Sequence, residues 1–299
     1  MTESLESIRE SSLIALTTPL YLIVIGVEVI FSNIQNRNLY SVKGTFTNFY
    51  LMLANMGLDL LVRGVSLFAL TYCYSIAVIH FENVIVYWVV LLIAQDFMYY
   101  LLHVVDHYCR LFWAIHVTHH SSEEFNLTVG FRSSVLQPLY RFLYFIPLAL
   151  AGFRGVDILF MYSATQIYGI LVHTQTINKL GFLEWFMVTP SHHRVHHASN
   201  PLYLDRNMGM VFIIWDRMFG TFQEELPNEP ATFGLTKSLE NPTPLNTVFH
   251  EFQAIFRDVR KPGIPLKARL NYVLGPPGWS HDGSSLTARE LRERVVSKK

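Results

Sequence analysis

Long apolar segments are the feature that most restricts how this chain can fold. Five of them approach the roughly 20 apolar residues that a helix needs to cross a hydrocarbon layer of about 30 Å. They are residues 13–32, 50–79, 84–102, 134–151 and 156–174. Because backbone polar groups inside a bilayer must be satisfied within the segment, we predict an all-α fold, a polytopic membrane helical bundle.

The composition agrees with a membrane protein and argues against a nucleic-acid partner. Hydrophobic residues make up 51% of the 299 residues, and 23 Lys and Arg balance 23 Asp and Glu, so no positive field would attract a polyanion. Cys73 and Cys109 match neither a disulfide framework nor a CxxC metal site. We interpret both cysteines as packing residues.

The basic residues predict an orientation. Threading the five segments places residues 33–49, 103–133 and those after 175 on one side of the membrane. That side carries Arg37, Lys43, Arg110, Arg132, Lys179, Arg194 and Arg206. The other side has only Arg9 and Arg154, so we expect the first side to be cytoplasmic and the N-terminus to lie outside. The acidic start "MTESLESIRE" is unlike a cleaved leader, so the first segment is expected to stay as an anchor.

Three parts are expected along the chain. N-terminal membrane helices occupy residues 1–83, a histidine-rich domain occupies 84–225, and a cytoplasmic segment occupies 226–299. The last part contains the amphipathic stretch "LNTVFHEFQAIFRDVRK", which is expected to cap the domain or to lie on the membrane surface.

Ten of the 13 histidines lie between residues 103 and 197. His103 and His107 form an HxxxH motif, so both face the same side of one helix. Two HxxHH motifs follow, at residues 116–120 and 193–197. Positions i, i+3 and i+4 fall within an arc of about 100° on a helix, so each triad is expected to aim at one point. His80, His250 and His281 lie outside this set and are interpreted as surface or interface residues.

The clustering predicts a metal site. A single histidine is usually a satisfied core or surface residue, but many neutral imidazoles beside a membrane would lose hydration and leave ring nitrogens unpaired. Eight or nine imidazoles exceed the four ligands of one zinc ion, and the Glu-x-x-His pair of carboxylate-bridged bundles is absent from the sequence. We therefore predict a histidine-rich site for two metal ions, and imidazole ligation alone does not choose between iron, zinc and copper.

The motifs carry a family resemblance. HxxxH followed by two HxxHH motifs between apolar helices resembles the fatty acid hydroxylase/sterol desaturase superfamily of membrane di-iron enzymes, from about Trp88 to Phe222. The segments "TPSHHRVHHASN" and "RNMGMVFIIWDRMFGTF" are most similar to its alkylglycerol monooxygenase-like branch.

The resemblance implies two Fe ions, O₂ as co-substrate, and oxidation of a lipid C–H bond in an apolar tunnel. It also implies His173, at the end of an apolar segment, as a further ligand. The implied ligands are His103, His107, His116, His119, His120, His173, His193, His196 and His197. His192, four residues before His196, competes with His193 for a ligand role, although helical phase favours His193.

Polar residues near the motifs suggest supporting roles. Asp96 lies two turns before His103 on the same face, so we expect its carboxylate to accept a ring N–H. Asp106, beside His107, and Asn207 are weaker candidates, and the resemblance to related enzymes implies that Asn207 reaches a metal-bound water. Asn55, Asp59 and Arg63, which recur every four residues, are interpreted as a self-neutralising structural set.

The expected function is that of a membrane oxidoreductase that hydroxylates a lipid, and the resemblance makes an ether lipid the first candidate substrate. Sterol or fatty-acyl hydroxylation or desaturation is the alternative, and a histidine-coordinated metal transporter is the alternative from another class. Because the sequence has no dinucleotide-binding fingerprint, electrons are expected from a separate donor, and the resemblance implies a reduced pterin or a cytochrome b5- or ferredoxin-type partner. We expect an integral protein of a bacterial inner membrane or the endoplasmic reticulum, with the metal site facing the cytoplasm.

Overall fold

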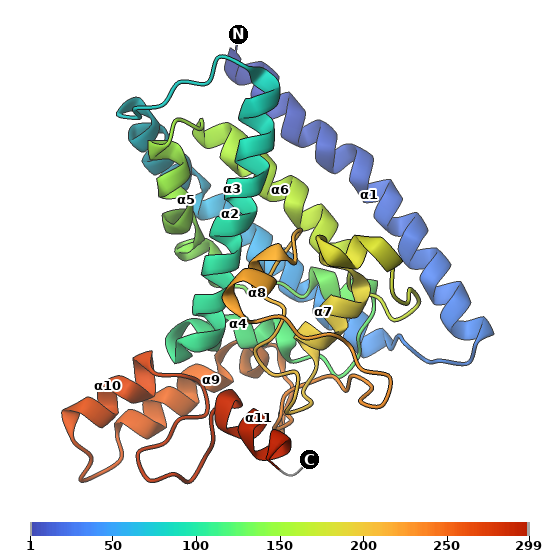
Figure 1. The fold of residues 1–299 in the computed structure, drawn as a ribbon, viewed down its shortest axis with the longest axis vertical. Helices are drawn as coiled ribbons and strands as arrows, with labels where there is room; N and C mark the ends of the chain where they lie inside the picture. Colours follow the sequence, from blue (N-terminus) through green and yellow to red (C-terminus); the bar gives the residue numbers. More distant parts are fainter. Residues whose placement is uncertain (1, 298–299) are drawn as a thin grey trace.

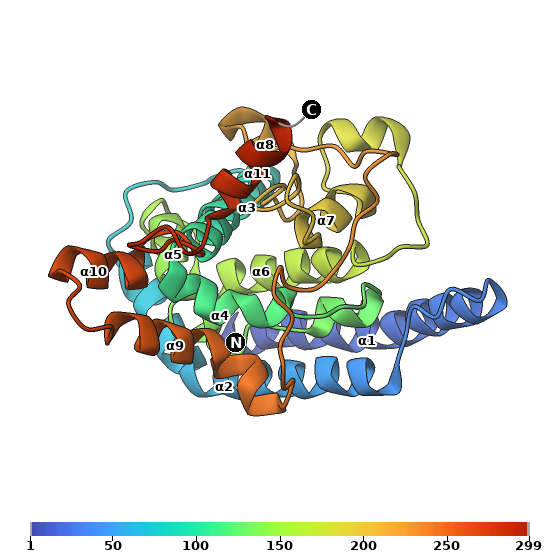
Figure 2. The same ribbon diagram turned by 90° about the horizontal axis from the view of Figure 1, so that it is seen from below.

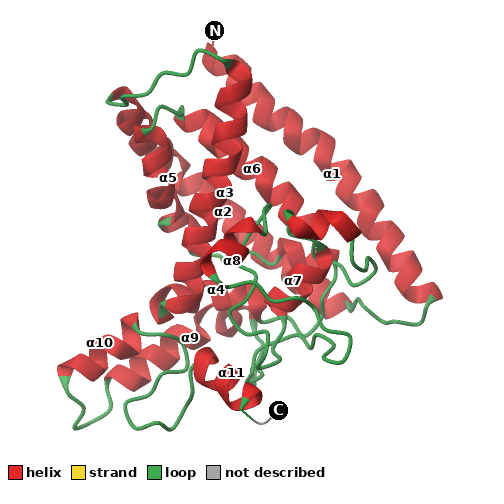
Figure 3. Ribbon diagram, viewed as in Figure 1, coloured by secondary structure: helices red, strands yellow, loops and turns green. Residues whose placement is uncertain are grey.

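The fold is a bundle of long helices with short helices gathered at one end (Figure 1). It is described by a computed structural model that covers residues 2–297. The bundle comprises α1 (Thr2–Ile34), α2 (Val42–Ser75), α3 (Val84–Tyr108), α5 (Arg141–Leu150) and α6 (Gly155–Leu171). Within the described residues there is no β-strand, and Figure 3 shows only helices and loops, which confirms the predicted all-α class.

Among the helices of residues 2–297, three are long and apolar enough to cross a membrane. They are residues Ala15–Ile34 within α1, all of α2 and all of α3, with mean hydropathies of 1.8, 1.5 and 1.8. Most of their side chains are not buried by the protein, as expected for helices that contact lipid. The prediction of a membrane helical bundle is thus confirmed for its first three segments.

The predicted segments at 134–151 and 156–174 form shorter helices than the first three segments. Helix α5 has 10 residues and α6 has 17, so at 1.5 Å per residue they are about 15 Å and 26 Å long, short of a 30 Å layer. They form a hairpin that packs against α2 and α3. Its turn touches the turn after α2, since a Cβ on Gly152 (φ +99°) would lie 2.1 Å from the Ile79 carbonyl oxygen. Both turns therefore lie at the same end of the bundle, as the threading predicted.

The opposite end of the bundle carries a helical cap (Figures 1 and 2). Its helices are α4 (Arg110–His120), α7 (Pro190–His197), α8 (Ile214–Phe219), α9 (Pro244–Val259), α10 (Leu266–Leu274) and α11 (Ala288–Val296), with the 3-10 turns η1 (Leu127–Phe131), η2 (Gln137–Leu139) and η3 (Gly181–Trp185). Helix α4 begins directly after α3. The cap is thus continuous with a membrane helix.

A buried carboxylate fastens α1 to the cap. Glu28 is 3% exposed, and it accepts hydrogen bonds from the Leu127 backbone N–H at 2.9 Å and from the hydroxyls of Tyr40 and Thr174. An unpaired carboxylate at this position would be costly, so the three donors hold α1 in one place relative to the segments near the histidines.

Candidate metal centre

The nine histidines predicted as ligands come together in two groups. The first histidine group contains His103, His107, His116, His120 and His196, and the second contains His119, His173, His193 and His197. In each group, one ring nitrogen per residue lies within 4.8 Å of the corresponding atoms of the others. All these residues except the half-buried His119 are buried. His80, His250 and His281 belong to neither group.

The two HxxHH motifs do not each aim at one point, contrary to the prediction. On α4, His116 and His120 belong to the first group, while His119 belongs to the second. On α7 the pattern is reversed, because His193 and His197 join the second group and His196 the first. Residues i and i+4 are only about 40° apart around a helix, whereas i+3 lies on the other side of i. Each helix therefore passes between the groups and serves both.

Outward hydrogen bonds fix the tautomers of several rings. The Nδ1 atoms of four histidines contact backbone carbonyl oxygens, which can only accept, so each Nδ1 carries the proton and Nε2 keeps a lone pair. The pairs are His103 with Met208 at 2.8 Å, His119 with Arg132 at 2.8 Å, His173 with Gly169 at 2.7 Å, and His196 with Arg206 at 2.9 Å. Such outer partners orient imidazoles that bind metals.

The Nε2 atoms, on the inner side of the rings, face one another. With the ring protons on Nδ1, these atoms lack the protons that hydrogen bonds between them would need. The Nε2 atoms of His103 and His116 are 3.1 Å apart, and that of His173 lies 3.2 Å from the His197 Nε2. Three more buried Nε2 atoms, those of His107, His120 and His196, have no hydrogen-bond partner. A metal ion in each group would satisfy these lone pairs, and four or five imidazoles suit a transition metal such as iron, zinc or copper. The residues thus fit the implied metal.

The cap histidines favour the form that binds metal. Burial lowers the pKa of His119 to about 4 and holds the pKa values of His196 and His197 well below the ordinary range. These imidazoles are therefore neutral near pH 7, and a neutral imidazole has a nitrogen lone pair available for a metal ion.

Two further histidines have polar outer partners. The Nδ1 of His107 lies 3.2 Å from the carboxylate of Asp205, and that of His116 lies 3.2 Å from the Ser134 hydroxyl and 3.6 Å from the carboxylate of Asp106. Asp106 is itself held by Gln137 at 2.8 Å and Tyr140 at 2.5 Å. Asp106 was a weak candidate from the sequence. Ser134 and Asp205 were missed, since neither belongs to a histidine motif.

Asp96 does not bond to His103, contrary to the prediction. Its buried carboxylate accepts hydrogen bonds from three donors on the segment after α7. They are the backbone N–H groups of Val211 at 2.8 Å and Phe212 at 3.1 Å and the Trp215 indole N–H at 2.8 Å. This segment lies against α3, so its N–H groups donate to Asp96, and its Met208 carbonyl oxygen accepts the hydrogen bond from the Nδ1–H of His103. Asp96 therefore holds the segment that positions the ring.

Asn207 does not reach toward the histidine groups either, so that expectation is also corrected. Its amide nitrogen donates to the carbonyls of His192 at 3.0 Å and Gln223 at 2.8 Å, and its oxygen accepts the Gln223 N–H at 2.9 Å. Its backbone has φ +55°, a left-handed conformation that Asn tolerates better than most residues. Asn207 thus ties its own loop to α7 and to the segment at Gln223.

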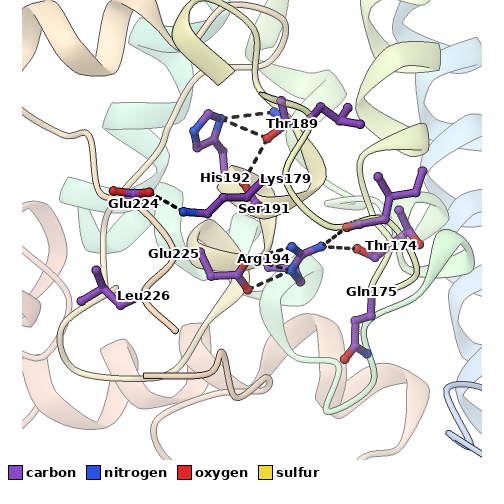
Figure 4. Close-up of polar contacts among 12 residues, drawn as sticks. Thr174, Gln175, Lys179, Thr189, Ser191, His192, Arg194, Glu224, Glu225 and Leu226 are labelled. Carbon is purple, nitrogen blue, oxygen red and sulfur yellow. Dashed lines mark hydrogen bonds and ion pairs between the residues drawn. The ribbon is translucent and has the colours of Figure 1, made fainter. Parts of the chain in front are cut away.

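His192 lies outside both groups. Its imidazole turns toward Thr189, whose backbone N–H donates to Nδ1 at 3.3 Å (Figure 4), and its Nε2 lies 4.0 Å from Glu184. This closes the start of α7 in a capping box. Nearby, Arg194 pairs with Glu225 at 2.7 Å and donates to the Thr174 carbonyl at 3.0 Å (Figure 4), so α7 is tied to the residue after His173.

A large cavity leads to the histidines. It has a volume of about 780 Å³ and is lined by α1, α2, α5 and α6, mostly with apolar side chains. His116 and His119, which belong to different histidine groups, both form part of its wall. A second space of about 40 Å³ adjoins the second group and shares Tyr99, Gln166 and His119 with the large cavity.

Charged residues interrupt the apolar wall. Asp59 lies 3.6 Å from Arg63, and its other carboxylate oxygen pairs with Arg141. The predicted ion pair of Asp59 and Arg63 is thus present, but Arg141 joins it, and Asn55 instead donates to the Ser134 carbonyl at 2.8 Å. One acidic and two basic residues make this part of the wall polar.

Comparisons with known proteins agree with this geometry. Residues 88–221 match the fatty acid hydroxylase family. The chain is 37% identical to alkylglycerol monooxygenase of Homo sapiens over 212 residues, 71% of this chain and 46% of that protein. It is 36% identical to the Xenopus tropicalis protein of the same name over 228 residues, 74% and 49% of the two chains. It is 29% identical to an ornithine lipid hydroxylase of Rhizobium tropici over 146 residues, 48% and 44%.

The chain spans about half the length of the curated relatives that it matches. No solved structure matches it.

Proposed function

The chain contains a fatty acid hydroxylase domain and is homologous to alkylglycerol monooxygenases, and on that premise we propose that it is a membrane monooxygenase that hydroxylates a C–H bond of a lipid. The observation that carries the proposal is that His116 and His119 line one large apolar cavity and belong to different histidine groups. A lipid chain in that cavity meets both groups at once.

We propose that each histidine group holds one iron ion. The first has five imidazoles and the second has four, and the ions, when bound, supply O₂ binding and the oxidation of the C–H bond. In the overall reaction one oxygen atom enters the C–H bond and the other leaves as water. Two electrons and two protons come from an external donor, a reduced pterin or a cytochrome b5- or ferredoxin-type protein.

The chain's own residues bind the lipid and hold the rings. The apolar faces of α1, α2 and α6 exclude water from the lipid chain, while the outward hydrogen bonds of His103, His119 and His173 keep their Nε2 atoms directed inward. Asp59, Arg63 and Arg141 provide the polar part of the wall, where we place the polar portion of the substrate.

An ether lipid is the first candidate substrate, because the relatives with the highest identity quoted above are named for alkylglycerols. Hydroxylation of the carbon next to an ether oxygen gives a hemiacetal, which breaks to an aldehyde and an alcohol. Sterol or fatty-acyl oxidation is the alternative, since hydroxylation and desaturation would use the same histidines. A metal transporter is disfavoured because the groups form at the end of α3 and between cap helices, whereas transport sites lie near the middle of a membrane.

The test supplies the iron-loaded full chain in nanodiscs with O₂, a reductant and three lipids: a 1-O-alkylglycerol, a free fatty acid and a sterol. Mass spectrometry follows a product that contains one atom of labelled O₂. We expect oxidation of the alkylglycerol, and loss of it in His116→Ala. Oxidation of another lipid alone would move the proposal to that substrate class, and no oxygen incorporation with any donor or lipid would contradict it.

A matched pair of variants tests the cavity. Ile167→Trp places an indole inside the cavity, whereas Val65→Trp places one at a residue of α2 that is 61% exposed and outside the cavity lining. We expect the first variant to lose turnover of long-chain substrate and the second to keep it, with equal iron content in both. Equal turnover in the two variants would show that the lipid binds elsewhere.

A further inference from the structure

A hairpin of α9 and α10 projects from the cap. Figure 2 shows α10 at the margin of the molecule, beyond α3 and α5. The hairpin is attached where α3 ends, because the backbone N–H of Arg110, two residues after Tyr108, donates to the Gly275 carbonyl at 2.9 Å. The end of α10 therefore lies close to the end of a membrane-length helix, near the level at which the bilayer surface is expected.

Helix α10 presents an apolar stripe away from the protein. Leu266, Leu270 and Leu274 recur every four residues and are 71%, 53% and 57% exposed. The opposite face packs inward, with Ala268 at 6% and Tyr272 at 1% exposure. This amphipathicity is inverted with respect to a helix facing only water, where exposed positions are polar.

The hairpin also carries an excess of exposed positive charge. Its acidic residues, Glu251 and Asp258, both pair with the side chain of Arg110, at 2.7 Å and 2.8 Å. Arg257, Arg260 and Lys267 remain on its exposed surface.

Apolar and basic groups also meet directly at the C-terminal end of α9. Arg260 lies 3.8 Å from the ring centre of Phe256, which is 54% exposed. Leucines flanked by cationic side chains are typical of helices that lie in the interface of a membrane with anionic lipids.

We propose that the α9–α10 hairpin docks on the membrane surface, with the stripe of Leu266, Leu270 and Leu274 at the boundary between headgroups and acyl chains. Arg257, Arg260 and Lys267 contact anionic headgroups. Because Arg110 links the hairpin to the start of α4, this docking fixes the cap at a set depth below the bundle. The inference depends on the membrane location of the chain and not on the reaction proposed above.

The test places a spin label on the full chain in nanodiscs of phosphatidylcholine and phosphatidylglycerol, after Cys73→Ala and Cys109→Ala. Label positions are Leu270→Cys on the stripe, Leu61→Cys as a lipid reference, and Arg289→Cys as a water reference, since Leu61 is 80% exposed on α2 and the Arg289 side chain 81% exposed on α11. Collisions with O₂ report lipid, and collisions with a water-soluble nickel chelate report water.

We expect the Leu270 label to behave like the Leu61 label. Behaviour like the Arg289 label, or protection from both reagents as under a protein partner, would overturn the proposal. The charge contribution is tested by Lys267→Glu, with Arg289→Glu as the control. We expect only Lys267→Glu to move the Leu270 label toward water when phosphatidylglycerol is present, and equal behaviour of the two variants would overturn the role of anionic lipid.

Discussion

The Nε2 atoms of His173 and His193 lie 2.9 Å apart, while the Nδ1 of His173 donates to the Gly169 carbonyl at 2.7 Å. The proton of the His173 ring is therefore on Nδ1, on the outer side, and the lone pair of its Nε2 faces the His193 imidazole. Either a proton on His193 or a metal ion must lie between the two rings. The protein thus supplies the outer hydrogen bond in advance, which keeps the ring in the orientation that a metal ion requires.

Two metal ions per chain are expected in protein purified with iron available. Five imidazoles in the first group and four in the second are enough to hold one ion each. Elemental analysis of the purified chain gives the ratio directly. A single ion per chain with full activity would contradict the two-ion site, whereas zinc in place of iron would not, because imidazole groups bind both metals.

Substitution of His173 by Ala should remove the metal of the second group and spare that of the first. His173 is one of only four ligands in its group and has no substitute there. We expect the metal content to fall from about two ions to about one and lipid oxidation to stop.

The controls for this prediction are His80→Ala, His250→Ala and His281→Ala. These residues lie outside both groups, so each variant should keep its metal and its activity. All variants are first checked for insertion and monodispersity. Full metal content in His173→Ala would remove His173 from the site.

The sequence was informative about the histidines because their spacing encodes helical geometry. HxxxH and HxxHH each require neighbours on a helix, so eight residues could be named from spacing before their positions were known, and the family resemblance added His173. Which residue joins which group depends on α4 and α7 passing between the groups, a tertiary relationship that no local pattern contains. Most outer hydrogen-bond partners of the histidines could not be predicted from the sequence. Those contributed by Met208, Gly169 and Arg132 are backbone carbonyls, which every residue type has.

The membrane segments were also predicted only in part. Apolar length predicted α1, α2 and α3 correctly, because a helix that contacts lipid must be apolar along its whole length. For α5 and α6 the same apolar composition occurs in shorter helices that pack against α2 and α3. Hydropathy cannot distinguish the two environments.

Orientation can be tested with reporter fusions. The excess of basic residues at the cap end predicts that Lys43 and the C-terminus are cytoplasmic and that Asn83 lies outside. Fusions ended at these three positions, with reporters active on opposite sides of the membrane, give the assignment. A cytoplasmic signal from Asn83 would reverse the bundle and place the metal centre on the other side.

Replacement of Asp96 by Asn should destabilise the fold before it affects metal binding. The carboxylate accepts three hydrogen bonds from Val211, Phe212 and Trp215, and an amide would present an N–H group to donors that need an acceptor. The loss of buried hydrogen bonds of this kind costs about 1–3 kcal/mol. Thermal unfolding of the metal-loaded variant, with Asp282→Asn as an exposed control, should show a lower Tm for Asp96→Asn alone.

Asp96 acts on His103 only through the segment that carries Met208. The metal content of Asp96→Asn should therefore fall only together with its Tm, when that segment is no longer held in place. Loss of metal at an unchanged Tm would instead show that Asp96 acts on the metal centre directly.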